Sequence, residues 1–197
     1  MSTGKVAGLR AQNKLATRRE LSRCGVDLFL KQGFANTTID QIVQPLGIAR
    51  RTFFRYFNTK EELVFTWYED LTPELVDALK SRPKEEKPFR AVCEALTSLL
   101  RLYDANPAWV LSMMRLLKET PSLIGSEFEK RVVWERALVT ALIQREGKRS
   151  TSALKAGIVV GTALTAFTAA LNEWYEGGGD AKLRPIVAKA FSMALDL

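Results

Sequence analysis

The chain contains no histidine among its 197 residues, and this absence excludes several kinds of catalytic and metal site. Without histidine there is no Ser-His-Asp triad, no Cys-His dyad and no His-ligated metal centre. Only two cysteines occur, Cys24 and Cys93, and their separation matches no metal-binding spacing. A glycine-rich phosphate loop and a carboxylate pair with metal spacing are also absent. These absences argue against an enzyme, and no cofactor or metal is expected.

Long hydrophobic runs are missing as well. The longest one, 156–171, is interrupted by Gly157, Gly161 and several threonines, and it is shorter than the ~20 residues of a membrane-spanning helix. The first nine residues are too few and too polar for the hydrophobic part of a secretory signal. Together with the low cysteine content, this predicts a protein of the reducing cytoplasm without a membrane partner.

The sequence does contain enough apolar material for a sizeable core, because 47% of its residues are hydrophobic. Its basic charge is unevenly placed. Residues 1–60 hold eleven Lys or Arg and three Asp or Glu, a net charge of +8, whereas residues 61–197 hold eighteen and nineteen, a net charge of −1. A basic end on a nearly neutral body is typical of a nucleic-acid-binding protein, since a merely solvated surface would scatter the same charges.

The stretch 37–60, TTIDQIVQPLGIARRTFFRYFNTK, predicts two short helices joined by a tight turn. Thr38 opens the first helix with the pattern of a capping box, and Gly47 supplies the left-handed conformation that often ends a helix. The second helix is expected to continue to Phe57 and to bury Phe53 and Phe57, which are four residues apart. This layout is that of a helix-turn-helix, whose second helix lies in the major groove of DNA.

The segment 47–63, GIARRTFFRYFNTKEEL, resembles the signature of the TetR family of bacterial transcriptional regulators, and the match continues upstream through GFANTTIDQIV. The resemblance implies an all-α protein with a three-helix, helix-turn-helix head at its N-terminus and a larger helical body. Two positions depart from the family pattern. Ala49 stands where many relatives have Ser or Thr, which removes a helix cap worth ~1 kcal/mol. Pro45 falls late in the first short helix and leaves the carbonyl of Gln41 without a partner.

The resemblance also assigns candidate DNA contacts within the helix-turn-helix, Thr38 to Phe57, and just after it. The expected DNA-facing residues are Thr38, Arg50, Arg51, Thr52, Phe54, Arg55, Tyr56 and Lys60. The first two arginines are expected to read base edges, because arginine pairs bidentately with O6 and N7 of guanine. Thr52 and Phe54 could contact a thymine methyl or a phosphate, and the other hydroxyl groups suit phosphates. Lys60 is expected in the first turn of the next helix, where backbone N–H groups favour an anion.

The rest of the chain also shows helical spacing of apolar residues, and about nine helices are expected in all. The expected domains are a DNA-binding helix-turn-helix domain, 1–60, and an effector-binding and dimerisation domain, 61–197. A polar loop is expected over 81–88. The last two helices, 150–174 and 180–197, are strongly apolar, and the resemblance implies that they form a four-helix bundle with a second copy of the chain.

Several large, soft side chains of the body could line an apolar cavity for an effector. The candidates are Trp109, Met113, Met114, Leu117, Trp134 and Phe167. Methionines and aromatic residues at helical spacing belong more often to an ordinary core, so both interpretations stay open at this point. The run MMRLLKETPSL and the late AALNEW resemble the branch of the family that includes mycofactocin-type regulators. This resemblance implies a hydrophobic or acyl-type effector, for example an acyl-CoA.

The favoured interpretation is a homodimeric transcriptional repressor that binds a palindromic DNA operator and is released by a small effector. A two-fold dimer would read half-sites about 34–36 Å apart or a multiple of that distance. The alternative is a ligand-independent, architectural DNA-binding protein, which a sharp footprint without any effector response would favour. A third possibility, an enzyme with a substrate pocket in the helical body, is disfavoured by the missing catalytic residue types.

Overall fold

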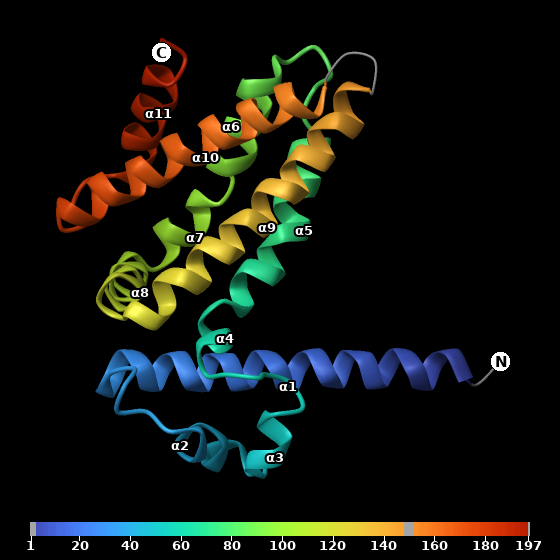
Figure 1. Ribbon diagram of the computed structural model, residues 1–197, viewed down its shortest axis with the longest axis vertical. Coiled ribbons are helices and arrows are strands. Elements are labelled where there is room, and N and C mark those ends of the chain that lie inside the picture. Colours follow the sequence, from blue (N-terminus) through green and yellow to red (C-terminus); the bar gives the residue numbers. More distant parts are fainter. Residues whose placement is uncertain (1–2, 148–151, 197) are drawn as a thin grey trace. The chain divides into compact units, whose positions relative to one another are not determined.

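The computed structural model describes residues 3–147 and 152–196 of the protein (Figure 1). Those residues form eleven α-helices and one 3-10 helix, and they include no strand. Each of the nine segments expected to be helical does contain helix, so the all-α fold class is confirmed. The count is higher than nine because three stretches of helix are divided, at Gln44, at Phe65 and at Ser98.

The described residues divide into two compact units. The first unit, which we call the head, comprises Met1–Trp67 and Leu116–Glu127. The second unit, which we call the body, comprises Tyr68–Arg115 and Phe128–Leu197. The head therefore includes a short segment from the middle of the chain in addition to the N-terminal residues.

The head is built on α1 (Thr3–Gln32), which packs against α2 (Ile39–Val43) and α4 (Glu61–Val64). Between the last two lie η1 (Gln44–Leu46) and α3 (Arg50–Phe53), and Figure 1 shows α2 and α3 on one side of α1. The core of the head includes large apolar side chains with at most 1% exposure, among them Leu21, Phe29, Ile42, Phe53, Phe57 and Leu63. Burial of these side chains holds the two short helices against α1.

The remaining helices follow in chain order and are separated by short loops. They are α5 (Thr66–Lys80), α6 (Pro88–Thr97), α7 (Leu100–Ala105), α8 (Pro107–Glu119), α9 (Pro121–Glu146), α10 (Ala153–Glu176) and α11 (Leu183–Met193). Pro88, Pro107 and Pro121 each begin a helix, where the missing N–H would have no helical acceptor in any case. The polar loop expected from the sequence lies between α5 and α6.

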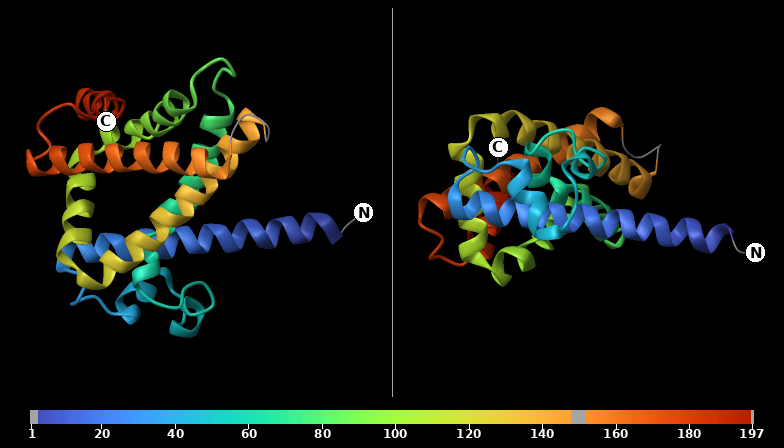
Figure 2. Two further views of the ribbon diagram at one scale, coloured as in Figure 1. Left: turned by 45° about the horizontal axis from the view of Figure 1, so that its top comes forward. Right: turned by 90° about the horizontal axis from the view of Figure 1, so that it is seen from below.

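Within the body, α10 packs against α11 and α6 (Figure 1 and Figure 2). Ser152 caps α10 by accepting a hydrogen bond from the main-chain N–H of Lys155, at 3.1 Å. Residues 150 and 151, at which this helix was expected to begin, lie outside the described residues. Among the described helices α10 alone is long and apolar enough to span a membrane. A buried core helix has the same properties, and eight residues of α10 are buried in the body.

Candidate nucleic-acid interface

The helix-turn-helix begins with the capping box that the sequence predicts. Thr38 accepts a hydrogen bond from the N–H of Gln41 at 3.3 Å, and the side-chain oxygen of Gln41 accepts one from the N–H of Thr38 at 2.9 Å. Pro45 lies inside η1, so the end of α2 tightens into a 3-10 turn. Gly47 then adopts the expected left-handed conformation, with φ of 64°, and reverses the chain toward α3. Ala49 precedes α3 and gives it no side-chain cap.

The segment that begins with α3 divides its side chains between core and solvent. Phe53 and Phe57 are 0% and 1% exposed, and their ring centroids lie 5.6 Å apart. Regular α-helix ends at Phe53, which is earlier than expected, but the N–H groups of Tyr56 and Phe57 still donate to the carbonyl of Phe53. The outward side chains are all members of the expected DNA-facing set: Arg50, Arg51, Phe54 and Arg55 are exposed, and Thr52 and Tyr56 are half-buried.

Arg50 is held from two sides. Its Nη1 atom lies 3.0 Å from Oδ2 of Asp40, which belongs to the first turn of α2. Its guanidinium carbon lies 5.9 Å from the ring centroid of Phe54, one turn further along. Arg51, by contrast, makes no hydrogen bond or ion pair within the part of the chain that the structure describes. The two neighbouring arginines therefore differ in how far their geometry is fixed before any DNA is bound.

Arg55, which is exposed, and Tyr56, which is half-buried, form a second group on this surface. The guanidinium of Arg55 donates to the hydroxyl of Tyr56 at 3.2 Å and lies 5.1 Å from the centroid of its ring. This hydrogen bond from Arg55 lowers the pKa of the Tyr56 phenol, and Thr17 and Lys14 of α1 act in the same direction. The group therefore combines two basic side chains with two hydroxyl groups, a set that suits a phosphate.

Lys60 points inward instead of toward solvent. Its ammonium group donates to the main-chain oxygens of Phe34 and Thr37, at 2.6 and 3.1 Å, and lies 4.2 Å from the centroid of the Phe34 ring. Lys60 itself precedes α4 without capping it through its side chain. At least two of the three ammonium protons are thus used inside the head, which leaves little of this charge for the phosphate contact expected from the sequence.

Sequence reasoning missed Asp40 and Thr17 as members of this surface. Asp40 lies ten positions before its partner Arg50, and Thr17 of α1 lies 39 positions before Tyr56. Helical spacing rules relate residues three or four positions apart on one helix, so neither contact has a local signal. The excess of basic residues in the N-terminal part indicated only that α1 belongs to the same charged surface.

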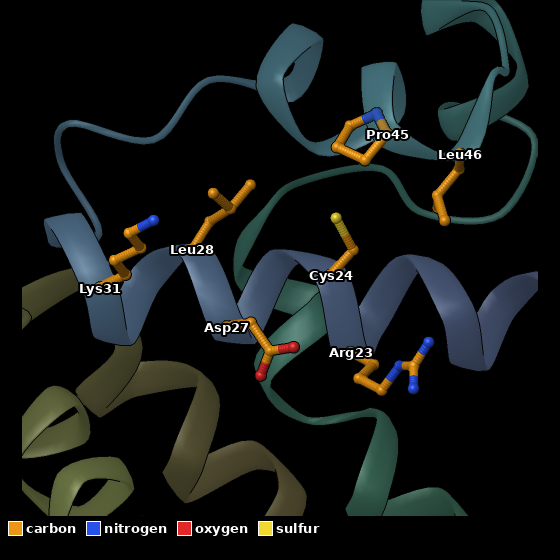
Figure 3. Close-up of a pocket in the computed structure, with 7 residues that line it drawn as sticks. All are labelled: Arg23, Cys24, Asp27, Leu28, Lys31, Pro45 and Leu46. Atoms are coloured by element: carbon orange, nitrogen blue, oxygen red, sulfur yellow. The ribbon is translucent and has the colours of Figure 1, made fainter.

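The head also contains an open hollow between α1 and η1 with a volume of about 300 Å³ (Figure 3). Its lining consists of Arg23, Cys24, Asp27, Leu28, Lys31, Pro45 and Leu46. Figure 3 shows Cys24 and Leu28 pointing from α1 toward Pro45 and Leu46. The thiol of Cys24 donates to the carbonyl of Ile42 at 3.3 Å, and burial raises its pKa. None of the expected effector-binding residues lines this hollow.

Comparison with known proteins identifies the family. The family model described as bacterial regulatory proteins of the tetR family matches residues 24–66, which contain the helix-turn-helix, and the MftR C-terminal domain matches residues 86–196. TcmR, an HTH-type transcriptional regulator of Streptomyces glaucescens, is 31% identical over 201 residues, which cover 99% of this chain and 88% of TcmR. The chain belongs to the TetR family. It is therefore a DNA-binding transcriptional regulator and not an enzyme.

The resemblance of this TetR-family protein to mycofactocin-type regulators is also confirmed. A protein of Mycobacterium tuberculosis whose name assigns it to the regulation of mycofactocin biosynthesis, MftR, is 25% identical over 162 residues, covering 79% of this chain and 80% of MftR. The crystal structure of Thermus thermophilus FadR, a TetR-family repressor in complex with lauroyl-CoA, matches with a TM-score of 0.63. That match covers 90% of this chain and 93% of FadR at 19% identity, so it shows the shared fold.

The expected effector-binding residues of this TetR-family protein have different environments. Trp109 is 38% exposed at the start of α8, whereas Met113 and Leu117 of the same helix are buried and Met114 is half-buried. Trp134 of α9 is buried. Its indole N–H donates to the main-chain oxygen of Tyr68 at 3.2 Å, and the two rings pack with centroids 4.7 Å apart.

Phe167 of α10 belongs to another aromatic group of the TetR-family body. Its ring centroid lies 6.4 Å from those of both Tyr103 and Phe191, edge-on to the first and stacked on the second. Phe191 comes from α11, so this group joins α7, α10 and α11. Trp134 and Phe167 thus pack with different partners. Both rings therefore make aromatic contacts of the kind found in a protein core.

Proposed function

We propose that this protein is a one-component repressor that acts as a homodimer in the cytoplasm, binds a palindromic operator and is released by a small apolar or acyl-type effector. One observation carries the DNA-binding part of the proposal. Phe53 and Phe57 fix the segment after Gly47 to the core, and the same segment presents its arginines to solvent. A helical segment anchored to the core by one face, with a basic outer face, is the geometry of a recognition helix.

The DNA contacts divide into two kinds by their geometry. Arg50 and Arg51 begin α3 and are suited to base edges, with Thr52 and Phe54 beside them. Arg55 and Tyr56 are assigned to a phosphate, because they are already paired and offer donors from adjacent positions. Thr38, which caps α2, is assigned to a second phosphate. Lys60 supports this surface from within and is not assigned a direct contact.

The dimer is proposed to form through α10 and α11. Apolar side chains stay exposed on or next to each helix in the single chain: Leu154 and Ile158 of α10 are 75% and 61% exposed, and Met193, which ends α11, and Leu195, just after it, are 60% and 67% exposed. Exposed apolar surface on two packed helices favours association with a second copy. A two-fold axis through such a bundle would place two recognition helices on half-sites about 34–36 Å apart or a multiple.

The effector is proposed to bind in the domain 61–197 and to act on the DNA-binding domain 1–60 through α4 and α5. The large apolar side chains of α8, α9 and α10 support an apolar site, and the lauroyl-CoA bound by FadR, a protein of the same fold, supports an acyl chain as ligand. The proposed lining residues are Trp109, Met113, Met114, Leu117, Trp134 and Phe167. In this mechanism the effector site and the DNA-binding surface are linked by a coupling free energy, which is typically about 1–3 kcal/mol.

The first experiment is selection of binding sites from a random duplex pool with the full-length protein, followed by fluorescence anisotropy on the selected duplex. A palindromic site and a steep dependence of affinity on salt are expected. Enrichment of no sequence beyond weak, uniform binding would overturn the proposal of an operator-specific repressor.

The effector is then tested on the same protein–operator complex. Titration with lauroyl-CoA, with free lauric acid and with coenzyme A alone separates the contribution of the acyl chain from that of the nucleotide. Weakening of operator binding by the acylated ligand is expected, and coenzyme A alone should have a smaller effect. A sharp operator footprint that responds to none of an apolar and acyl ligand series would favour the ligand-independent, architectural alternative.

A further inference from the structure

Asp40, Arg50 and Phe54 form a contiguous exposed group at the beginning of α3. The side chains of Arg50 and Asp40 are 58% and 65% exposed although they are paired at 3.0 Å. Phe54 is 48% exposed, and its ring centroid lies 5.9 Å from the guanidinium carbon of Arg50. The core of the head does not require any of these three side chains, because Phe53 and Phe57 fill that role.

The pair with Asp40 leaves most of the guanidinium available. A guanidinium carries five N–H donors in one plane, and the contact with Asp40 is made from Nη1 alone. Two further donors are enough for the bidentate pair with O6 and N7 of a guanine. A free arginine would have to lose side-chain freedom on binding, whereas Arg50 is already held by a carboxylate and a ring. Asp40 and Phe54 therefore pre-orient Arg50.

An exposed phenylalanine ring beside a guanine-reading arginine has one apolar target in the major groove. Of the four base pairs, those with thymine present a C5-methyl group there, and phenylalanine is among the side chains that contact it. The Phe54 ring lies beside Arg50, so the methyl group it can reach belongs to a base pair next to the guanine.

We propose that Asp40, Arg50 and Phe54 act as one reading unit, which selects a guanine and a thymine in adjoining base pairs of each operator half-site. Arg50 donates two hydrogen bonds to the guanine, Phe54 contacts the thymine methyl group, and Asp40 is a positioning residue that holds Arg50. The inference rests on the proposed function, in which α3 enters the major groove. It adds two points to that function: the operator half-site contains a guanine next to a thymine, and Asp40 has a role on an otherwise basic surface.

The acidic charge gives Asp40 a signature that a purely structural residue lacks. A carboxylate close to DNA repels phosphates, so it lowers the affinity for every sequence. The same carboxylate raises the affinity for the correct sequence by holding Arg50. Replacement of Asp40 by asparagine should therefore lower operator affinity and leave affinity for random duplex unchanged or higher.

The test uses the full-length protein and the duplex selected by the wild type. Exchange of the guanine for 7-deazaguanine removes the N7 acceptor and should weaken wild-type binding about fivefold or more. Exchange of the adjoining thymine for deoxyuridine removes the methyl group and should weaken it about threefold. Arg50→Ala should be insensitive to the first exchange, and Phe54→Ala should be insensitive to the second.

Asp40→Asn is compared with Asp27→Asn, which makes the same change of charge on α1 of the head. Site selection with Asp40→Asn should show a preference for the guanine reduced about three- to tenfold, whereas Asp27→Asn should reproduce the wild-type sequence. A wild-type site without an adjoining guanine and thymine overturns the reading unit, as does equal sensitivity of wild type and variants to the modified bases. An unchanged preference in Asp40→Asn overturns the role of Asp40. In each of these cases, a palindromic site selected by the wild type would still support the proposed function. If the wild type selects no site, both the reading unit and the proposed function are wrong.

Discussion

The ammonium nitrogen of Lys60 lies 2.6 Å from the main-chain oxygen of Phe34, which is 26 positions earlier in the chain. A second hydrogen bond joins the same nitrogen to the carbonyl of Thr37, at 3.1 Å. Phe34 and Thr37 form the loop through which the chain leaves α1 and enters the helix-turn-helix. One side chain at the end of the motif therefore fixes the entrance to it, and the positive charge satisfies two carbonyl groups that no helix uses.

Lys60→Met should destabilise the head by about 1–3 kcal/mol, because methionine keeps the apolar stem and removes the charged donor. The measurement is hydrogen exchange of the peptide that spans residues 34–57. Operator binding should weaken through this loss of order, but the slope of log affinity against log salt should stay that of the wild type. A slope reduced by about 1 would show instead that Lys60 contacts a phosphate.

The matched variant for this measurement is Arg55→Ala, since Arg55 is exposed and assigned to a phosphate. It should reduce the salt slope by about 1 and weaken operator and random DNA to a similar extent. Hydrogen exchange of the same peptide should remain close to the wild type. A reduced salt slope in Lys60→Met together with faster hydrogen exchange in Arg55→Ala would contradict the roles given to both residues.

Gly25→Ala should destabilise the head by about 1–3 kcal/mol, because the added Cβ would lie 2.5 Å from Cδ1 of Leu63. Leu63 is fully buried, so the shift that relieves this overlap must be taken up within the core of the head. Gly125→Ala is the matched control: its Cβ meets nothing within 4 Å. Alanine is the better helix former by up to about 1 kcal/mol, and the control should be as stable as the wild type or more so. Thermal unfolding by circular dichroism compares the two, and an unaffected Gly25→Ala protein would contradict the packing of α1 on α4.

Much of the helix-turn-helix could be predicted from the sequence because its determinants are local. The capping box joins Thr38 and Gln41 within one turn, Gly47 is required by the positive φ of its own backbone, and Phe53 and Phe57 are one turn apart. Each of these features depends on residues at most four positions from one another. Propensity and periodicity describe relations of that range, so their prediction was correct.

The parts that could not be predicted depend on contacts between distant residues. The inward direction of Lys60 depends on Phe34, and the pair of Arg50 with Asp40 crosses from α3 to α2. The sequence also left open whether Trp134 and Phe167 line a cavity or belong to an ordinary core, and the structure packs Trp134 on Tyr68 and Phe167 on Phe191. Apolar periodicity identifies the face of a helix that is buried, but it does not identify the helix against which that face packs. Tertiary packing decides the partner.

Ala49→Ser should stabilise the head by about 0.5–1 kcal/mol. Residue 49 is the N-cap of α3 and has the extended conformation, φ −74° and ψ 148°, that a capping serine adopts, but alanine has no oxygen to accept a hydrogen bond from the helix. Ala49→Val is the control, because it adds volume at the same exposed site without a capping oxygen. Hydrogen exchange at the start of α3 should slow in the serine variant alone, and equal protection in both variants would contradict the capping argument.

Alkaline conditions should destabilise the body through Cys93 of α6. Burial raises the pKa of the Cys93 thiol to about 12 from an ordinary value of 9.0, and the adjacent charge of Glu94 adds to the rise. Above pH 9 the unfolded chain releases this proton while the folded chain keeps it. The contribution of Cys93 to the free energy of unfolding is therefore constant below pH 9 and should fall by about 1.4 kcal/mol per pH unit between 9 and 12.

Cys93→Ala isolates this effect, because the titration of every other group is shared with the wild type. Removal of the buried sulfur should cost some stability at pH 8, but the difference between wild type and variant should shrink by about 2 kcal/mol when urea unfolding is repeated at pH 10.5. Cys24→Ala should show a smaller change, since Cys24 is only half-buried and no large pKa shift applies to it. A difference between wild type and Cys93→Ala that does not depend on pH would mean that the thiol ionises as easily in the folded body as in the unfolded chain, and that α6 opens around Cys93 in alkaline solution.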